Sequence, residues 1–175
     1  EVLPEVEAQI EGGMSGCSPL EVDLLNLSNG AASYTWNFGD GDQSTGQHVN
    51  HIFTTNPGED MTYTVSLVAQ SVHGCTDTAQ VTVQVFASPV ADFSTGAAIL
   101  TYPETTVSLA NLSTASASAD HYWTFGDGQV SYDVNPSEHD YDTWGIYEIT
   151  LEVDNGYCSS VASSAVQILA PTPTI

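Results

Sequence analysis

The amino-acid sequence predicts an all-β protein made of two tandem β-sandwiches. Three observations lead to this prediction. Apolar and polar residues alternate along short segments, turn-forming residues separate those segments, and one long pattern occurs twice. Alternation with a period of two is typical of half-buried strands, and about seven short strands per copy is the number expected for a sandwich.

The alternating segments appear in both halves of the chain. MTYTVSLVAQ at 61–70 and AQVTVQVF at 79–86 alternate in the first half, and IYEITLEV at 146–153 alternates in the second. Gly, Asn, Asp and Ser gather between these segments at intervals of about ten residues, as turns between strands require. No segment shows an apolar stripe with the 3.6-residue period of a helix.

The repeat is clearest in one six-residue block. WNFGDG at 36–41 returns as WTFGDG at 123–128, an offset of 87 residues (123 − 36). Further along, Tyr63 falls on Tyr147 at an offset of 84 (147 − 63). Order and spacing are kept while the offsets drift, as loop insertions would produce, so we expect two copies of one structural unit.

The boundary between the copies falls near VFASPVADF. We expect one domain over residues 1–86, a second over 87–170, and a tail or linker to a next domain at 171–175. The segment Phe86–Pro89 is short and contains Pro89, which predicts a semi-rigid, elongated pair. The chain begins with EVLPEVEAQI and ends with APTPTI, and we expect it to be a piece of a longer secreted protein.

The charge is extreme. The chain has no Lys and no Arg against 22 Asp and Glu, a formal net charge of −22. Without Lys or Arg side chains the chain cannot form ion pairs with a nucleic-acid phosphate backbone, so we expect no nucleic-acid partner. A P-loop lysine, an arginine finger and a Schiff-base lysine are excluded too. No run of about 18 apolar residues occurs, so no membrane insertion is expected.

Three blocks carry a family resemblance. YTWNFGDG and HYWTFGDG, then PSEHDY, then GIYEITLEV resemble the PKD (polycystic kidney disease) domain, which is an Ig-like β-sandwich. The second copy has every part of the pattern. The first departs from it, because TTNPGEDMTY inserts residues before Tyr63. The resemblance implies two tandem Ig-like sandwiches.

A narrower likeness concerns the cysteines. GCSPLEV and HGCTDT are similar to PKD repeats in large surface proteins, adhesins among them, of bacteria with type IX secretion. In that group the two cysteines pair, which implies a Cys17–Cys75 disulfide. Tyr102 stands where a second Cys17 would align, so Cys158 is expected to be a buried free thiol, with an interchain bridge as the alternative.

The repeated block is expected to be structural. Trp36 and Phe38 lie two residues apart and so share a strand face, which favours the core over an exposed platform for sugars. Gly39, Asp40 and Gly41 predict a tight turn. The second copy supplies the matching residues Trp123, Phe125, Gly126, Asp127 and Gly128.

A weak calcium site at Asp40 and Asp42 is the alternative for this turn, with Asp127 and Asp133 as its counterpart. The spacing of a calcium-binding loop is absent, and diffuse binding of divalent ions to the acidic surface is the favoured form. No other cofactor is expected. His51 and His139 occupy matching positions, which favours a structural hydrogen bond over a zinc site.

Two modification sequences are present. NLS at Asn26–Ser28 and at Asn111–Ser113 fits an N-glycosylation sequon, but its recurrence at matching positions favours a structural role. DTA at Asp77–Ala79 is similar to the O-glycosylation sequence of the same bacteria, which would place a sugar on Thr78.

We therefore expect a non-catalytic spacer or stalk in a large extracellular, cell-surface or secreted, adhesin-like protein. No nucleophile motif such as G-x-S-x-G and no suggestive Cys–His pair is found. The expected partners are neighbouring repeats of the same chain, with surface polysaccharide or self-association as further candidates. The alternatives are an accessory binding module of a secreted polysaccharide- or protein-degrading enzyme and a building block of a surface fibre or layer.

Overall fold

The computed structural model describes residues 5–171 and divides the chain into two compact units, Glu1–Ala87 and Ser88–Ile175. The division falls one residue after the boundary expected from the sequence. Residues 172–175 of the expected tail lie outside the described residues. Within residues 5–171, no helix has the length and the hydropathy needed to cross a membrane.

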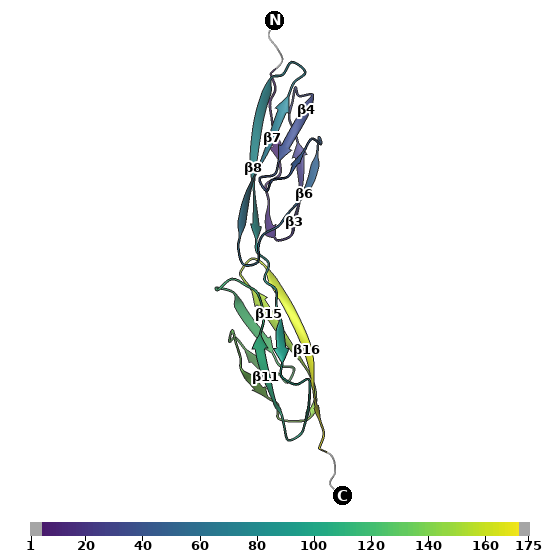
Figure 1. The fold of residues 1–175 in the computed structure, drawn as a ribbon, viewed down its shortest axis with the longest axis vertical. Coiled ribbons are helices and arrows are strands. Elements are labelled where there is room, and N and C mark those ends of the chain that lie inside the picture. Colours follow the sequence, from purple (N-terminus) through teal and green to yellow (C-terminus); the bar gives the residue numbers. More distant parts are fainter. Residues whose placement is uncertain (1–4, 172–175) are drawn as a thin grey trace. The chain divides into compact units, whose positions relative to one another are not determined.

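Unit 1 has two facing sheets (Figure 1). The smaller sheet has the strand order β1–β3–β6, from Ile10–Glu11, Leu20–Asn26 and Val49–Phe53. The larger sheet has the order β2–β8–β7–β4–β5, from Ser15–Cys17, Thr76–Phe86, Met61–Gln70, Ser33–Asn37 and Gln43–Ser44. The neighbouring strands are antiparallel except for β2 and β8, which are parallel.

Unit 2 repeats this arrangement strand for strand. Its smaller sheet, β14–β11–β9, contains Glu138–Asp140, Thr106–Asn111 and Phe93–Thr95. Its larger sheet, β10–β16–β15–β12–β13, contains Ile99–Thr101, Ser159–Leu169, Gly145–Asp154, Asp120–Thr124 and Val130–Ser131. The parallel pair recurs as β10 and β16. The chain is therefore all-β, with two tandem Ig-like sandwiches, as the sequence predicted.

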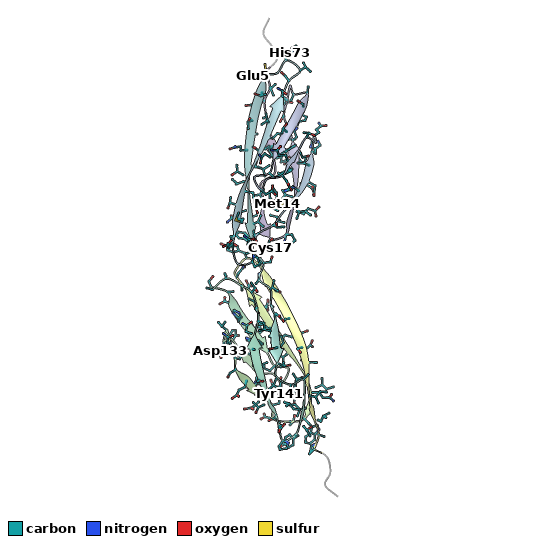
Figure 2. The ribbon with its side chains drawn as sticks, in the orientation of Figure 1. Glu5, Met14, Cys17, His73, Asp133 and Tyr141 are labelled. Atoms are coloured by element: carbon teal, nitrogen blue, oxygen red, sulfur yellow. The ribbon has the colours of Figure 1, made fainter. Side chains whose placement is uncertain are left out.

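Each unit has its own hydrophobic core between its two sheets (Figure 2). In β7, inward residues alternate with exposed ones, and β15 alternates in the same way. Burying one such aliphatic side chain stabilises the fold by about 1.5–3 kcal/mol. The largest buried side chains of the two cores include Trp36, Phe53 and Leu67 in unit 1 and Trp123, Tyr141 and Leu151 in unit 2.

Candidate functional site: the repeated aspartate–histidine clip

The repeated block forms the end of one strand and a tight turn. In unit 1 the turn joins β4 to β5, and the N–H of Phe38 donates to the main-chain oxygen of Asp42 at 3.1 Å. Gly39 has φ +85°, and a Cβ there would lie 2.8 Å from the oxygen of Thr64. Glycine is needed here both for the positive φ and for this close approach.

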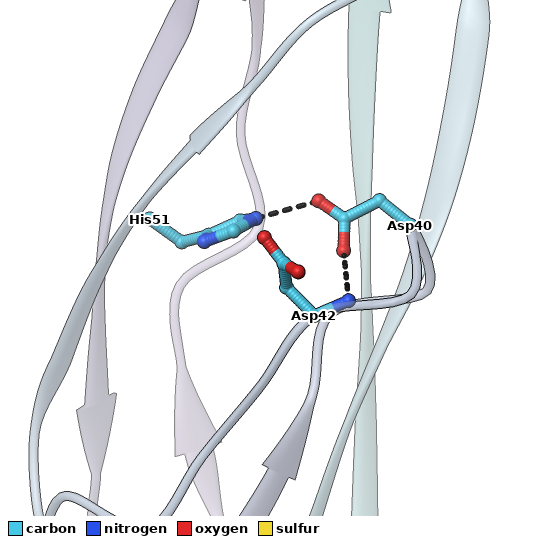
Figure 3. Close-up of side chains that lie close together, drawn as sticks. All are labelled: Asp40, Asp42 and His51. Atoms are coloured by element: carbon cyan, nitrogen blue, oxygen red, sulfur yellow. Dashed lines mark hydrogen bonds and ion pairs between the residues drawn. The ribbon is translucent and has the colours of Figure 1, made fainter.

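Asp40 holds the turn with both carboxylate oxygens. Oδ1 accepts a hydrogen bond from the N–H of Asp42 at 3.0 Å, and Oδ2 lies 2.6 Å from Nε2 of His51 (Figure 3). Because a carboxylate can only accept, the imidazole Nε2–H is the donor in this second bond. We call this Asp–His pair, with the turn that carries it, the clip.

The clip joins the two sheets of unit 1. Asp40 follows β4 of the larger sheet, whereas His51 lies in β6 of the smaller sheet. The imidazole stacks on the ring of Phe38, with centroids 4.0 Å apart and planes 4° apart. Its edge meets Phe53 at 4.7 Å and 81°. The histidine is therefore held by an acid at one side and by core aromatics at its face and edge.

Unit 2 builds the same clip. Asp127 accepts from the N–H of Gln129 at 2.9 Å, and its other oxygen lies 2.8 Å from Nε2 of His139. His139 stacks on Phe125 with centroids 3.9 Å apart and meets Tyr141 edge-on at 4.7 Å. The same geometry in two units identifies the clip as a property of the fold.

The electrostatics favour ionised aspartates. Burial raises the pKa of Asp40, but the hydrogen bonds from His51 and from the Asp42 main chain outweigh it, so the pKa is lowered from 3.8. In the same way, burial of Asp127 is outweighed by the bonds from Gln129 and His139, and its pKa is lowered. Burial, with the nearby negative charge of Asp127, raises the pKa of Tyr141, which stays neutral.

The clip of unit 1 has one additional acid. One ligand atom from each of Asp40, Asp42 and His51 lies within 4.8 Å of the others. Calcium prefers oxygen ligands, so the imidazole nitrogen fits it poorly, and both oxygens of Asp40 already accept hydrogen bonds. Unit 2 has Gln129 in the place of Asp42. Calcium binding at Asp40 and Asp42 stays a prediction.

The expected counterpart in unit 2 is used differently. The carboxylate of Asp133 accepts from the hydroxyl of Ser131 at 3.1 Å, and its main-chain oxygen accepts from the indole of Trp123 at 3.0 Å. The indole of Trp36 donates to the main-chain oxygen of Gly46 at 2.9 Å. Both tryptophans of the repeated block are fully buried, so neither forms an exposed platform for sugars.

The predicted cysteine pairing is wrong. Cys75 has a free thiol, whereas Cys17 and Cys158 are both disulfide-bonded, so the prediction of Cys158 as a free thiol is wrong as well. The strand register explains the first result. Cys17 pairs with Phe86 at the end of β8, and Cys75 precedes the start of β8. Eleven residues (86 − 75) at about 3.3 Å each separate the two positions by roughly 35 Å, far beyond the ~7 Å limit for a disulfide.

The modification sequences lie in ordered places. Asn26 is buried and its side-chain oxygen accepts from the N–H of Ser28 at 2.9 Å, and Asn111 does the same with Ser113 at 2.9 Å. Both NLS segments are therefore turns with a structural role. Thr78 is exposed on β8 beside Asp77, and glycosylation there stays a prediction.

Sequence reasoning placed the members of the clip but did not pair them. The sequence predicts a turn at Asp40 and a structural hydrogen bond for His51, but it does not identify the partner of His51. The available signal was that aspartate and histidine recur together, as Asp127 and His139 do in the second copy.

Comparison with known proteins follows the division into two units. A family model described as PKD domain matches residues 2–85 and again residues 86–169. The PKD1 domain of Vibrio anguillarum Epp is 31% identical over 49% of this chain and 99% of that chain, with a TM-score of 0.41. The PKD1 domain from the Vibrio cholerae metalloprotease PrtV is 28% identical over 47% and 98%, with a TM-score of 0.39. Among curated proteins, none matches. Because the family model matches almost the whole chain, once in each unit, the chain belongs to the PKD domain family and contains two PKD domains in tandem.

Proposed function

We propose that the two PKD domains are a non-catalytic spacer in a large extracellular bacterial surface protein of the adhesin type. The observation that carries this proposal is the clip. In both units the polar groups of the repeated block bond within their own sandwich, and the aromatic groups lie in the core. The most distinctive residues of the chain therefore support stability and leave no reactive group facing a ligand.

The surface charge supports the same role. With 22 acidic residues and no Lys or Arg, like-charged copies repel one another, which opposes self-association. Salt screens this repulsion inside each domain, since the Debye length is about 8 Å at physiological ionic strength and shorter in saltier media. Trypsin-like proteases, which cut after Lys or Arg, have no cleavage site in this sequence. These properties suit a stalk exposed to an outside medium.

The cysteines also support an extracellular location. Cys17 and Cys158 are disulfide-bonded, and disulfides persist mainly in oxidising compartments. A spacer outside the cell gains from such a bond, because a crosslink restricts the unfolded chain.

Small-angle scattering combined with retention assays tests the spacer. We expect the two-domain chain to scatter as a stiff particle whose length is the same at low and high salt, with no retention on chitin, cellulose or collagen. Retention on one of these polymers would favour the accessory binding module and overturn the spacer. Filaments that grow with protein concentration would favour the surface fibre and overturn it as well.

A further inference from the structure

Unit 2 presents a pair of exposed tyrosines that the fold does not require. Trp123 pairs with Ser131, so the next residues outward, Tyr122 and Tyr132, lie opposite one another across β12 and β13. Their ring centroids are 5.3 Å apart and the planes are tilted by 39°. The side chains are 36% and 74% exposed, respectively. Exposed apolar side chains that stand singly are normal on a protein surface, whereas neighbouring exposed rings form a contiguous patch of the kind that binds a partner.

The tyrosines line a groove of about 460 Å³ together with Asp120, His121, Glu152 and Asp154, which we call the tyrosine groove. The strand register places Glu152 opposite Tyr122, and Asp154 opposite Asp120. Side chains directly opposite on antiparallel strands are neighbours, and two like charges in this position are unfavourable. The chain has no Lys or Arg to neutralise them.

His121 also lines the groove, but it lies between Asp120 and Tyr122 on β12, so its side chain points to the opposite, buried face of the strand. His121 is only 8% exposed, and its Nδ1 lies 3.0 Å from the main-chain oxygen of Ala119. A carbonyl oxygen only accepts, so Nδ1 carries the hydrogen in this bond. The groove thus combines two aromatic faces with acceptors and no donor cation.

Unit 1 shows that a PKD sandwich does not need these residues. Trp36 pairs with Leu67 and Ser44 as Trp123 pairs with Leu151 and Ser131, so the two larger sheets have the same register. The residues of unit 1 that match Asp120, Tyr122, Tyr132, Glu152 and Asp154 are Ser33, Thr35, Thr45, Val68 and Gln70, and Tyr34 matches the inward-facing His121. The five residues that match the outward groove positions are neither aromatic nor charged. The groove is therefore an addition to unit 2 and not part of the scaffold.

We propose that the tyrosine groove binds an arginine side chain of another protein. A guanidinium is planar and weakly hydrated, and it can stack on a tyrosine face while it donates to carboxylates at its edge. Its fork of donors matches the acceptors of Glu152, Asp120 and Asp154, and its charge relieves their mutual repulsion. The arginine must come from a different protein, because this chain has none.

Arginine fits the groove better than other cations. The ammonium of lysine is a compact, strongly hydrated charge that does not stack by a flat face. An amino sugar also carries an ammonium, so it shares this disadvantage. Attraction of any cation to a chain of charge −22 is expected everywhere on the surface, and the test must separate this general attraction from binding in the groove.

Isothermal titration calorimetry of the full chain at 150 mM NaCl makes this separation. The probes are acetyl-GRGRG-amide, the same peptide with lysines, and a glucosamine oligomer. We expect the arginine peptide to bind about tenfold more tightly than the lysine peptide, and the glucosamine oligomer to bind more weakly than either. The double variant Tyr122→Thr/Tyr132→Thr, which installs the residues of unit 1, should lose about tenfold in affinity for the arginine peptide.

Two charge variants complete the test. Asp120→Asn/Glu152→Gln removes two carboxylates from the groove, and Glu11→Gln/Glu21→Gln removes two exposed ones from unit 1. Only the first pair should weaken binding of the arginine peptide, and it should raise the melting temperature of unit 2 because the cross-strand repulsion is reduced. If these carboxylates served only the stability of unit 2, removing them would not weaken binding of the arginine peptide while raising the melting temperature.

Several outcomes would overturn the proposal. Equal affinity for the arginine and lysine peptides, or equal losses in the two charge variants, would show general attraction to a polyanion. Binding of the glucosamine oligomer that depends on Tyr122 and Tyr132, without binding of the arginine peptide, would assign the groove to a glycan. Circular dichroism melts of each variant ensure that a loss of binding is not a loss of folding. Failure of arginine binding leaves the spacer untouched, because the spacer is tested by scattering and by retention on polymers, whereas glycan binding in the groove would also favour the accessory binding module over the spacer.

Discussion

Replacing Asp40 with alanine is the sharpest test of the clip. The change removes both acceptors at once, the one for the N–H of Asp42 at 3.0 Å and the one for Nε2 of His51 at 2.6 Å. It leaves the imidazole without its partner next to the core ring of Phe38. It also removes one side-chain bond between the two sheets of unit 1, so we expect the whole unit to lose stability.

The magnitude follows from these two bonds. Both bonds end on the ionised carboxylate of Asp40, and a hydrogen bond to a charged group contributes about 1.5–3 kcal/mol. The side chains of His51 and Asp40 are 14% and 22% exposed, so water competes in part and each bond contributes no more than about the low end of this range. We expect Asp40→Ala to reduce the free energy of unfolding of unit 1 by about 2–3 kcal/mol. For a domain of this size that is roughly 10–20 °C in melting temperature.

Urea titration followed by fluorine NMR of 5-fluorotryptophan measures this change in each unit separately. Trp36 is in unit 1, whereas Trp123 and Trp144 are in unit 2, so their resonances report on the two units separately. Asp40→Ala should shift only the Trp36 transition, and Asp127→Ala only those of Trp123 and Trp144. The matched control is Asp42→Ala, which removes an exposed carboxylate but keeps the N–H donor, and should change stability by less than about 0.5 kcal/mol. Our reasoning is refuted if Asp40→Ala costs no more than this control.

Three further predictions follow from the same structure. The pKa of the Asp40 carboxyl is lowered, so the stability that the ionised carboxylate contributes is complete above the ordinary pKa of 3.8 and is lost as the pH falls through the lowered pKa. The difference in the free energy of unfolding between wild type and Asp40→Ala should therefore shrink from about pH 5 to pH 2. A difference that stays constant would contradict this. Cys75 should react with iodoacetamide without reduction, while Cys17 and Cys158 should react only after it, as mass spectrometry of the peptides would show. Millimolar calcium should raise the melting temperature equally in wild type and in Asp42→Ala, since diffuse screening needs no site; a rise that depends on Asp42 would establish specific calcium binding.

Much of the fold was predictable because its signals are local. Alternation along 61–70 and 146–153 marks the strands, since side-chain direction in a strand depends only on position in the sequence. The spacing of Trp36 and Phe38 marks the core for the same reason, and both are buried. The repeat adds a second, independent copy of each signal.

The predictions that failed depended on distance through space. The Cys17–Cys75 pairing was implied by a family resemblance, but the parallel register of β2 on β8 places those residues at opposite ends of a long strand. The pairing of Asp40 with His51 also escaped prediction, because it joins two different sheets. Neither arrangement has a signal within a few residues of either partner.

The sequence by itself determined the strands, the two units, the family and the polyanionic surface, because these follow from local periodicity, from internal repetition and from composition. Tertiary structure decided which side chains meet. Packing of two sheets turns Asp40 and His51 into a clip, and strand register gathers Tyr122, Tyr132 and three carboxylates into one groove. The physical reason is that register and sheet packing are set by the sum of many contacts along the chain, and no single stretch of sequence contains that sum.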